Sequence, residues 1–248
     1  MRGRILIALA AAAALAGCQE SGFDESKETQ RPLKVQHALD PLTGTKVPGQ
    51  AERPMTLTPD TLGDTLALGV RPIRAALPGG RLPAYLRSEA KGIEVVPPLT
   101  RLDLAAAEAA GPDLILGTKE GQGPLYEDLR RIAPTVMSEG DDWKLNLRLH
   151  GEALGRTNDA EKLLIDWDNR VAEVMDTIGG RDLSVVLASR DGLRTADPES
   201  FAGKVLADLG VDAGRHGDAV LRVNAGPEWS GSGILAARAA LADLLRAL

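Results

Sequence analysis

Reactive side chains are sparse in this 248-residue chain, and their spacing gives little support to catalysis. The three histidines, His37, His150 and His216, lie far apart and show no zinc-ligand spacing. No GxSxG motif marks a nucleophilic serine. The glycine-rich stretch 117–123 lacks the GK[ST] ending of a phosphate-binding loop. These patterns predict no catalytic residue, no metal site and no cofactor.

Polar and aromatic side chains follow one strongly apolar segment, residues 113–117 (DLILG), which predicts a buried strand. In an α/β sheet, ligands bind at the carboxyl ends of the strands. Lys119 is therefore a candidate for attracting an anionic ligand, and Gln122 and Tyr126 flank the same loop. The alternative is that this loop is solvated and its charge has no partner.

The only cysteine, Cys18, follows an N-terminal segment typical of exported proteins. Two arginines precede an uncharged apolar run over residues 5–16, and small residues follow it. The run is shorter than the ~20 residues of a membrane span. Residues 15–18 (LAGC) look like a bacterial lipobox, which implies that residues 1–17 are removed and that Cys18 carries a diacylglycerol. A buried free cysteine and an ordinary signal peptide are the alternatives.

Composition limits the class of protein and its partners. Hydrophobic residues make up 44% of the chain and charged residues 26%, as in a globular protein long enough for one large domain or two lobes. The net charge of −6 argues against nucleic acid, which binds clustered basic residues. Residues 18–50 are polar and rich in turn formers, and they predict a lipid anchor followed by a flexible tether.

Short strands alternate with helices between residues 51 and 147. The strand candidates are residues 54–57, 71–77, 93–97, 113–117 and 135–138. The helix candidates are residues 58–68, 82–92, 102–111 and 123–134, the first with Thr58 as N-cap. This alternation predicts βα units and a largely parallel sheet.

The clearest helical pattern covers residues 159–178, with one apolar stripe that includes Trp167 as a core residue. Asn158 is the expected cap, and the helix would be roughly 30 Å long. Beyond it, a hairpin is expected around Asp191–Gly192. A helix over 197–210, a short strand and a closing helix over 230–248 complete the pattern.

Five phrases in a fixed order resemble the iron-siderophore class of ABC-transporter substrate-binding lipoproteins. They are residues 52–70, 111–136, 149–164, 199–210 and 229–245. The resemblance implies an α/β fold of two lobes with mostly parallel sheets, joined by one long helix, with ligand bound in the cleft between them. It implies a ferric siderophore, haem or cobalamin as cargo and an ABC permease as partner.

The sequence departs from this family in its last third. The segment between 213 and 229 is several dozen residues shorter than usual, which predicts a reduced C-terminal lobe. Leu187 stands where the family often has a cleft arginine, and Ala196 where it often has a tyrosine. The carboxylate that docks the permease falls near Ala105, with Asp103 and Glu108 close by in sequence. Permease docking is therefore in doubt.

Four further candidates follow from the expected cleft. Trp143 could stack on a flat ligand or serve as a packing residue. Trp229 could line the cleft or plug the shortened lobe, and Arg190 and Arg194 could supply positive charge there. The stretch 230–233 (SGSG) could bind an anion at a helix start, although simple capping explains it better.

The expected organisation is a signal peptide, an anchor with a tether, an N-terminal lobe, linking helices and a reduced C-terminal lobe. The corresponding ranges are 1–17, 18–50, 51–147, 148–180 and 181–248. The leading hypothesis is a solute-binding protein for an iron chelate, lipid-anchored on the outer face of the cytoplasmic membrane. An envelope interaction lipoprotein without transport is the alternative. An enzyme is disfavoured, although sequence alone leaves a Ser–His–Asp site open.

Overall fold

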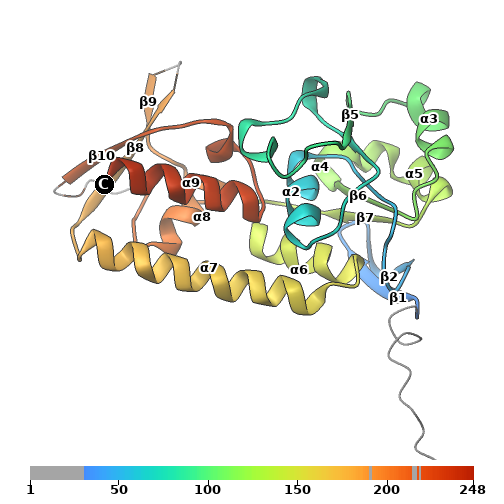
Figure 1. Cartoon of the computed structure of the whole chain (residues 1–248), viewed down its shortest axis with the longest axis horizontal. Coiled ribbons are helices and arrows are strands. Elements are labelled where there is room, and N and C mark those ends of the chain that lie inside the picture. The colour runs from blue at the N-terminus through green and yellow to red at the C-terminus, as the bar shows by residue number, and fades with distance from the viewer. Residues whose placement is uncertain (1–30, 190–191, 214–216, 218) are drawn as a thin grey trace, which may run out of the picture.

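The computed structural model describes residues 31–189, 192–213, 217 and 219–248, which form two α/β lobes. The N-terminal lobe lies on the right in Figure 1 and the smaller C-terminal lobe on the left. A long helix, α7 (Thr157–Ile178), starts beneath the N-terminal lobe and runs along both lobes to the far end of the C-terminal lobe. The expected fold class is confirmed.

Five parallel strands form the sheet of the N-terminal lobe, in the order β5-β4-β3-β6-β7. They are β3 (Pro54–Thr56), β4 (Arg74–Ala76), β5 (Glu94–Val96), β6 (Leu114–Thr118) and β7 (Thr135–Ser138). The helices that connect them are α2 (Pro59–Ala67), α3 (Leu104–Ala109), α4 (Lys119–Gln122) and α5 (Tyr126–Ile132). All five predicted strands are present, and the central ones are buried on both faces, as parallel strands require.

Helix α2 begins where the sequence predicts. The Thr58 hydroxyl accepts a hydrogen bond from the Thr61 backbone N–H, and the Thr61 hydroxyl accepts one from the Thr58 backbone N–H, which forms a capping box. The predicted helix over 82–92 is wrong, because only a 3-10 turn at Ala84–Leu86 forms there. Leu86 and Ala90 instead bury their side chains in a small core beside α2.

Residues 33–47 form a β-hairpin, so the prediction of a tether across 18–50 is wrong for this part. Strands β1 (Leu33–His37) and β2 (Asp40–Val47) pair antiparallel. Val35 and Val47 are buried, and the Ala38 backbone N–H donates to the Met137 carbonyl of β7 at 3.0 Å. The hairpin is therefore part of the N-terminal lobe.

The C-terminal lobe has a three-stranded sheet in the described residues, in the order β10-β8-β9. Strand β8 (Leu183–Ser189) pairs antiparallel with β9 (Gly192–Arg194), which confirms the hairpin, and parallel with β10 (Ala219–Asn224). Helices α8 (Phe201–Asp208) and α9 (Ile234–Ala247) cover it, and a 3-10 turn at Pro227–Ser230 precedes α9.

Aromatic side chains pack the junction between α7, α8 and helix α6 (Trp143–Ala153). Trp143 meets Trp167 edge to face at 5.2 Å between ring centroids and Phe201 at 6.5 Å. The Trp167 indole N–H donates to Asp208 at 2.8 Å. Trp167 is a core residue, as predicted, but α7 begins at Thr157 rather than after the expected cap Asn158.

One apolar core runs through both lobes. It includes residues of α6, α7, α8 and α9 together with β6 and β8. Helix α9 begins against α2 and then runs along the C-terminal lobe to the C-terminus. Two helices, α7 and α9, thus hold the lobes in a fixed relation.

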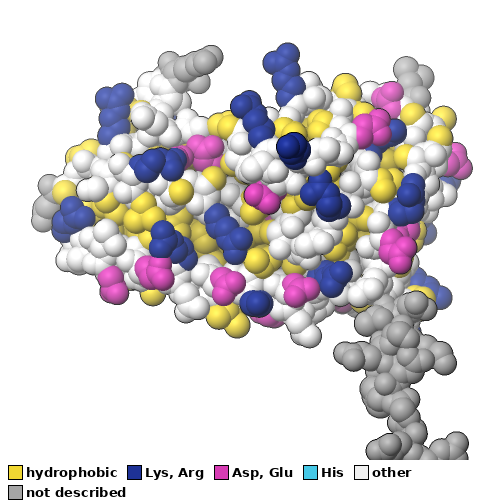
Figure 2. Space-filling view, viewed as in Figure 1, with side chains coloured by type: hydrophobic (Ala, Val, Ile, Leu, Met, Phe, Trp, Pro, Cys, Tyr) yellow, Lys and Arg dark blue, Asp and Glu magenta, His cyan; other side chains and the backbone are white. Residues whose placement is uncertain are grey.

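Charges of both signs are interspersed over the face shown in Figure 2, without a large patch of one sign. Across the part of the chain that the structure describes, no helix is long and apolar enough to cross a membrane.

Candidate cleft between the lobes

Two neighbouring pockets lie between the lobes. The first, of about 380 Å³, is lined by the start of α2, the ends of β6 and β7, α6 and Ser232. The second, of about 220 Å³, is lined by residues of the C-terminal lobe. Both are lined by Asp141, and they meet along residues 230–232, so they form two parts of one cleft. The first part lies at the carboxyl ends of parallel strands, where α/β folds bind ligands.

A buried carboxylate organises the first pocket. Asp64 accepts a hydrogen bond from the His150 imidazole Nδ1 at 2.8 Å and another from the Ile234 backbone N–H at 2.9 Å. Its neighbour Asp60 accepts one from the Ser232 backbone N–H at 3.0 Å. Helices α2, α6 and α9 therefore meet at this point, and the contact ties the C-terminal lobe to the N-terminal lobe.

The start of α9 does bind anions, but these are the carboxylates of the chain itself. The expectation that the serines of residues 230–233 cap the helix is wrong. The cap position is held by Gly233, which has no side chain to accept a hydrogen bond. Its φ of +83° and its closeness to Asp64 both require glycine, since a Cβ would lie 2.6 Å from Oδ1. Asp60 and Asp64 instead accept the N–H groups of Ser232 and Ile234.

Negative charge accumulates in this pocket. Burial and the charge of Asp64 raise the pKa of Asp60 to about 6. Burial, together with the charges of Asp60 and Asp64, also raises the pKa of the nearby Tyr85 hydroxyl. His150 is fully buried, and its Nε2 makes no hydrogen bond to any residue that the structure describes.

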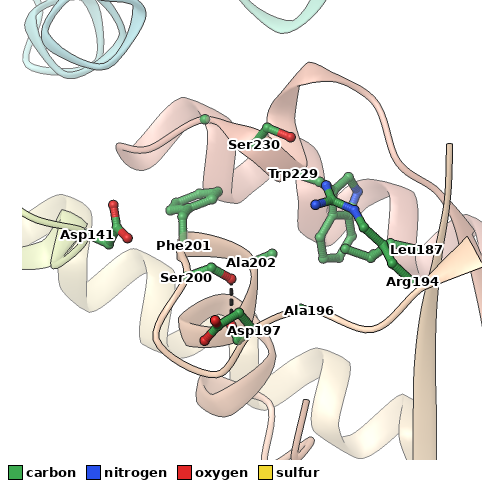
Figure 3. A pocket seen from close by; sticks show the side chains of 11 residues that line it. Asp141, Leu187, Arg194, Ala196, Asp197, Ser200, Phe201, Ala202, Trp229 and Ser230 are labelled. Atoms are coloured by element: carbon green, nitrogen blue, oxygen red, sulfur yellow. Dashed lines mark hydrogen bonds between the residues drawn. The ribbon is translucent and has the colours of Figure 1, made fainter. Parts of the chain in front are cut away.

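The second pocket contains the positions where the sequence departs from the family pattern. Leu187 and Ala196 both line it, beside Arg194 and the rings of Phe201 and Trp229. Figure 3 shows Asp141 and Phe201 on one side of this pocket and Trp229, Arg194 and Leu187 on the other. The wall of the C-terminal lobe thus combines apolar side chains with the guanidinium of Arg194 and the carboxylate of Asp197.

Three of the predicted contact residues pack against other parts of the protein and do not line the cleft. Trp143 is 1% exposed and packs at the helix junction, so the packing alternative is correct. Tyr126 is buried against His37, at 3.5 Å from its Nε2. The Gln122 amide accepts a hydrogen bond from the Thr118 backbone N–H and donates one to the Leu57 carbonyl. Both bonds hold the amide against the end of β6, away from the cleft.

The four remaining candidates differ in position. Lys119 is exposed and forms an ion pair with Glu139 at 2.6 Å, which raises the pKa of the lysine, and it lines neither pocket. Trp229 and Arg194 line the second pocket. The Trp229 indole N–H also donates to Asp243 of α9, so this residue both lines the cleft and belongs to the core. Arg190 lies outside the described residues.

Sequence reasoning missed the polar residues that face the first pocket. Asp60 and Asp64 lie inside the predicted helix over 58–68, Asp141 comes shortly before α6, and His150 has no other histidine at ligand spacing. Their partners lie 86 to 172 residues away along the chain. No local pattern reports such a pairing. The glycine-rich stretch before α9 was the one local sign that another segment of the chain lies close to this helix start.

Comparison with known proteins adds an independent finding. A family model described as periplasmic binding protein matches residues 56–213. Over 215 residues the chain is 30% identical to a protein of Bacillus subtilis (strain 168) named "Probable siderophore-binding lipoprotein YfiY". The match covers 83% of this chain and 66% of that protein, so the chain spans slightly less than two thirds of the relative's length.

Solved structures show the same fold. The petrobactin-binding protein YclQ of Bacillus subtilis aligns with a TM-score of 0.68 at 20% identity, over 88% of this chain and 98% of that one. Staphylococcus aureus SirA complexed with staphyloferrin B aligns with a TM-score of 0.63 at 22% identity, over 86% of this chain and 82% of that one.

Proposed function

The chain belongs to the periplasmic binding protein family, and from this premise we propose that it binds a ferric chelate in the cleft between its lobes and delivers it to an ABC importer. The observation that carries the proposal is the two-part cleft. It lies at the carboxyl ends of β6 and β7 and is closed on the other side by Phe201 and Trp229. A preformed cleft with apolar walls and a few polar groups is typical of small-molecule sites.

The rigid junction suits a site that changes little on binding. Helix α7 and the contact between α9 and α2 both cross between the lobes. We therefore expect backbone shifts of at most about 1 Å when the ligand enters. Affinity would then depend on the groups already facing the cleft.

Lipid attachment at Cys18 is part of the proposal. The lipobox-like residues 15–18 lie outside the described residues, and support for an anchor comes from their sequence and from the lipoprotein name of YfiY. Metabolic labelling with palmitate tests it. Label should be incorporated by the natural chain and lost in Cys18→Ser, and equal labelling of the two would contradict the anchor.

The alternative is an envelope lipoprotein that has kept the fold without transport. The small sheet of the C-terminal lobe and the missing arginine at Leu187 favour it. Asp103, near the expected docking position, accepts hydrogen bonds from the Thr100 backbone and hydroxyl. Both bonds go to one carboxylate oxygen, Oδ2, and the residue is exposed, so these bonds alone favour neither function.

Calorimetric titration of the purified protein separates the two functions. The panel comprises ferric hydroxamate, catecholate and citrate complexes, haem and cobalamin. Saturable binding of a ferric chelate, with no binding of the iron-free chelator, supports transport cargo. A cooperatively folded protein that binds none of them would contradict the proposal and leave the alternative.

A further inference from the structure

Among the described residues that line the cleft, the charged side chains are mostly acidic. Five carboxylates face its two pockets, against one guanidinium, that of Arg194. They are Asp60, Asp64, Glu120, Asp141 and Asp197. Ferric tris-catecholates and ferric citrates are anions, and such a lining repels them.

Some of these carboxylates have partners within the protein. Asp64 is bonded to His150 and Ile234, and Glu120 accepts the Gly140 backbone N–H at 3.1 Å. Asp141 is exposed and borders both pockets. Hydrogen bonds from backbone N–H groups do not cancel a net charge, so the cleft keeps a negative potential.

A second observation points to a ligand with a hydrogen-bond donor. In the neutral imidazole of His150, the bond to the Asp64 carboxylate holds the proton on Nδ1, and Nε2 then carries a lone pair. This nitrogen is buried and has no described partner, and His150 lines the first pocket. A buried polar atom without a partner is costly, and in a pocket rich in acceptors only a donor can satisfy it.

We propose that the cleft selects a ferric chelate of neutral or positive charge that carries a free ammonium group, and that this ammonium binds beside His150 and Asp141. An ammonium supplies three donors and one positive charge, which matches a pocket of carboxylates and one imidazole lone pair. Ferric trihydroxamates with a terminal amine have this chemistry. The inference rests on the proposed function and specifies the charge class of its cargo.

The apolar part of the cleft fits the same ligand. The hydrocarbon spacers of a trihydroxamate can pack on Phe201, Leu187 and Trp229 in the second pocket. Burial is the main cause of the raised pKa of Asp60, and the charge of Asp64 adds to it; a bound cation would offset that negative charge.

Three ferric chelates test the effect of ligand charge separately from that of ligand shape. Ferrioxamine B carries a free ammonium, its N-acetyl derivative is the same ferric trihydroxamate without that charge, and ferric tris(2,3-dihydroxybenzoate) is an anion. Calorimetric titration compares their affinities for the natural protein and for Asp141→Asn, which keeps the shape and removes the charge. Asp166→Asn is the matched control, because this exposed acid of α7 lines a different pocket.

The expected result is that ferrioxamine B binds about tenfold or more tightly than its acetylated form, as one charged hydrogen bond predicts. The preference should shrink several-fold in Asp141→Asn and persist in Asp166→Asn. Equal affinity for the two trihydroxamates, or tighter binding of the anion, would overturn the inference and leave the proposed function standing. Absence of binding by any ferric chelate would overturn both.

A spectroscopic readout tests the position of the ammonium. With the diamagnetic gallium complex of desferrioxamine B, the ¹⁵N resonance of His150 Nε2 should shift as its lone pair accepts a hydrogen bond, and the natural protein and Asp166→Asn should give the same shift. An unchanged Nε2 resonance at saturation would contradict the placement.

Discussion

Asp64 Oδ2 and His150 Nδ1 lie 2.8 Å apart at the junction of the two lobes, and both side chains are 1% exposed. The same carboxylate accepts the first N–H of α9 through its other oxygen, at 2.9 Å. One side chain thus orders a helix of each lobe and the imidazole that faces the cleft.

Removal of this carboxylate should destabilise the whole protein. Asp64→Ala leaves both His150 Nδ1 and the Ile234 N–H buried without an acceptor, so we expect a loss of about 3–5 kcal/mol in the free energy of unfolding. Asp64→Asn can still accept one of the two bonds and should lose less. Urea denaturation measures both against Asp166→Asn. A loss below about 0.5 kcal/mol for Asp64→Ala would contradict this role.

Substitutions at Gly233 and Gly69 test two separate costs: the strain of a positive φ and the close approach of a neighbouring atom. Both have positive φ, +83° and +77°, but a Cβ at 233 would lie 2.6 Å from Asp64 Oδ1, whereas nothing lies within 4 Å at 69. Gly69→Ala should cost about 1–2 kcal/mol, the strain alone. Gly233→Ala should cost clearly more in the same thermal or urea unfolding experiment. Equal losses would show that the contact with Asp64 does not constrain this position.

Asp60 should make stability depend on pH in an unusual direction. Its pKa of about 6 lies above its ordinary value of 3.8, so between these two pH values the folded protein holds a proton that the unfolded chain has released. Stability from this group is therefore full below about pH 4 and is lost as pH rises through about 6. The groups facing it are Asp64, Asp141, His150 and the Ser232 N–H.

Asp60→Asn keeps an acceptor for Ser232 and removes the charge. It should gain about 1–3 kcal/mol relative to the natural protein at pH 7.5 and little at pH 4. Melting temperatures at the two pH values, with Asp166→Asn as control, measure the difference. A gain that is equal at both pH values would contradict the raised pKa.

Substitution of Trp143 tests whether this residue packs the core or contacts the ligand. Because it is buried against Trp167 and Phe201, Trp143→Ala should cost about 3–5 kcal/mol of stability. At a temperature where the variant stays folded, its chelate affinity should fall much less than that of Trp229→Phe, whose ring lines the cleft. A selective loss of affinity in Trp143→Ala at unchanged stability would place Trp143 in the site.

Cation binding should itself depend on pH. A bound ammonium favours ionised Asp60, so affinity for ferrioxamine B should rise by up to about tenfold per pH unit below pH 6 and level off above 7. Titrations between pH 5 and 8 measure this, with the acetylated chelate as the control that should show a flatter profile. Matching profiles for the two chelates would contradict a coupling to Asp60.

Local patterns predicted most of the elements, because strands such as Leu114–Thr118 and the stripe of α7 follow their own periodicity. The hairpin at 33–47 was missed because its buried residues, Val35 and Val47, are few and separated by polar positions. The cleft was expected from the resemblance to the siderophore-binding class. Its polar residues were not, since Asp64 acquires its role only when His150 and Ile234 reach it from elsewhere in the chain.

A crystal structure of the protein with bound ferrioxamine B tests the central claim most directly. We expect the chelate between the start of α2 and the rings of Phe201 and Trp229, with its ammonium near His150 and Asp141, and the lobes within about 1 Å of their positions here. A chelate bound outside this cleft, or a cleft left empty at saturating ligand, would contradict the account.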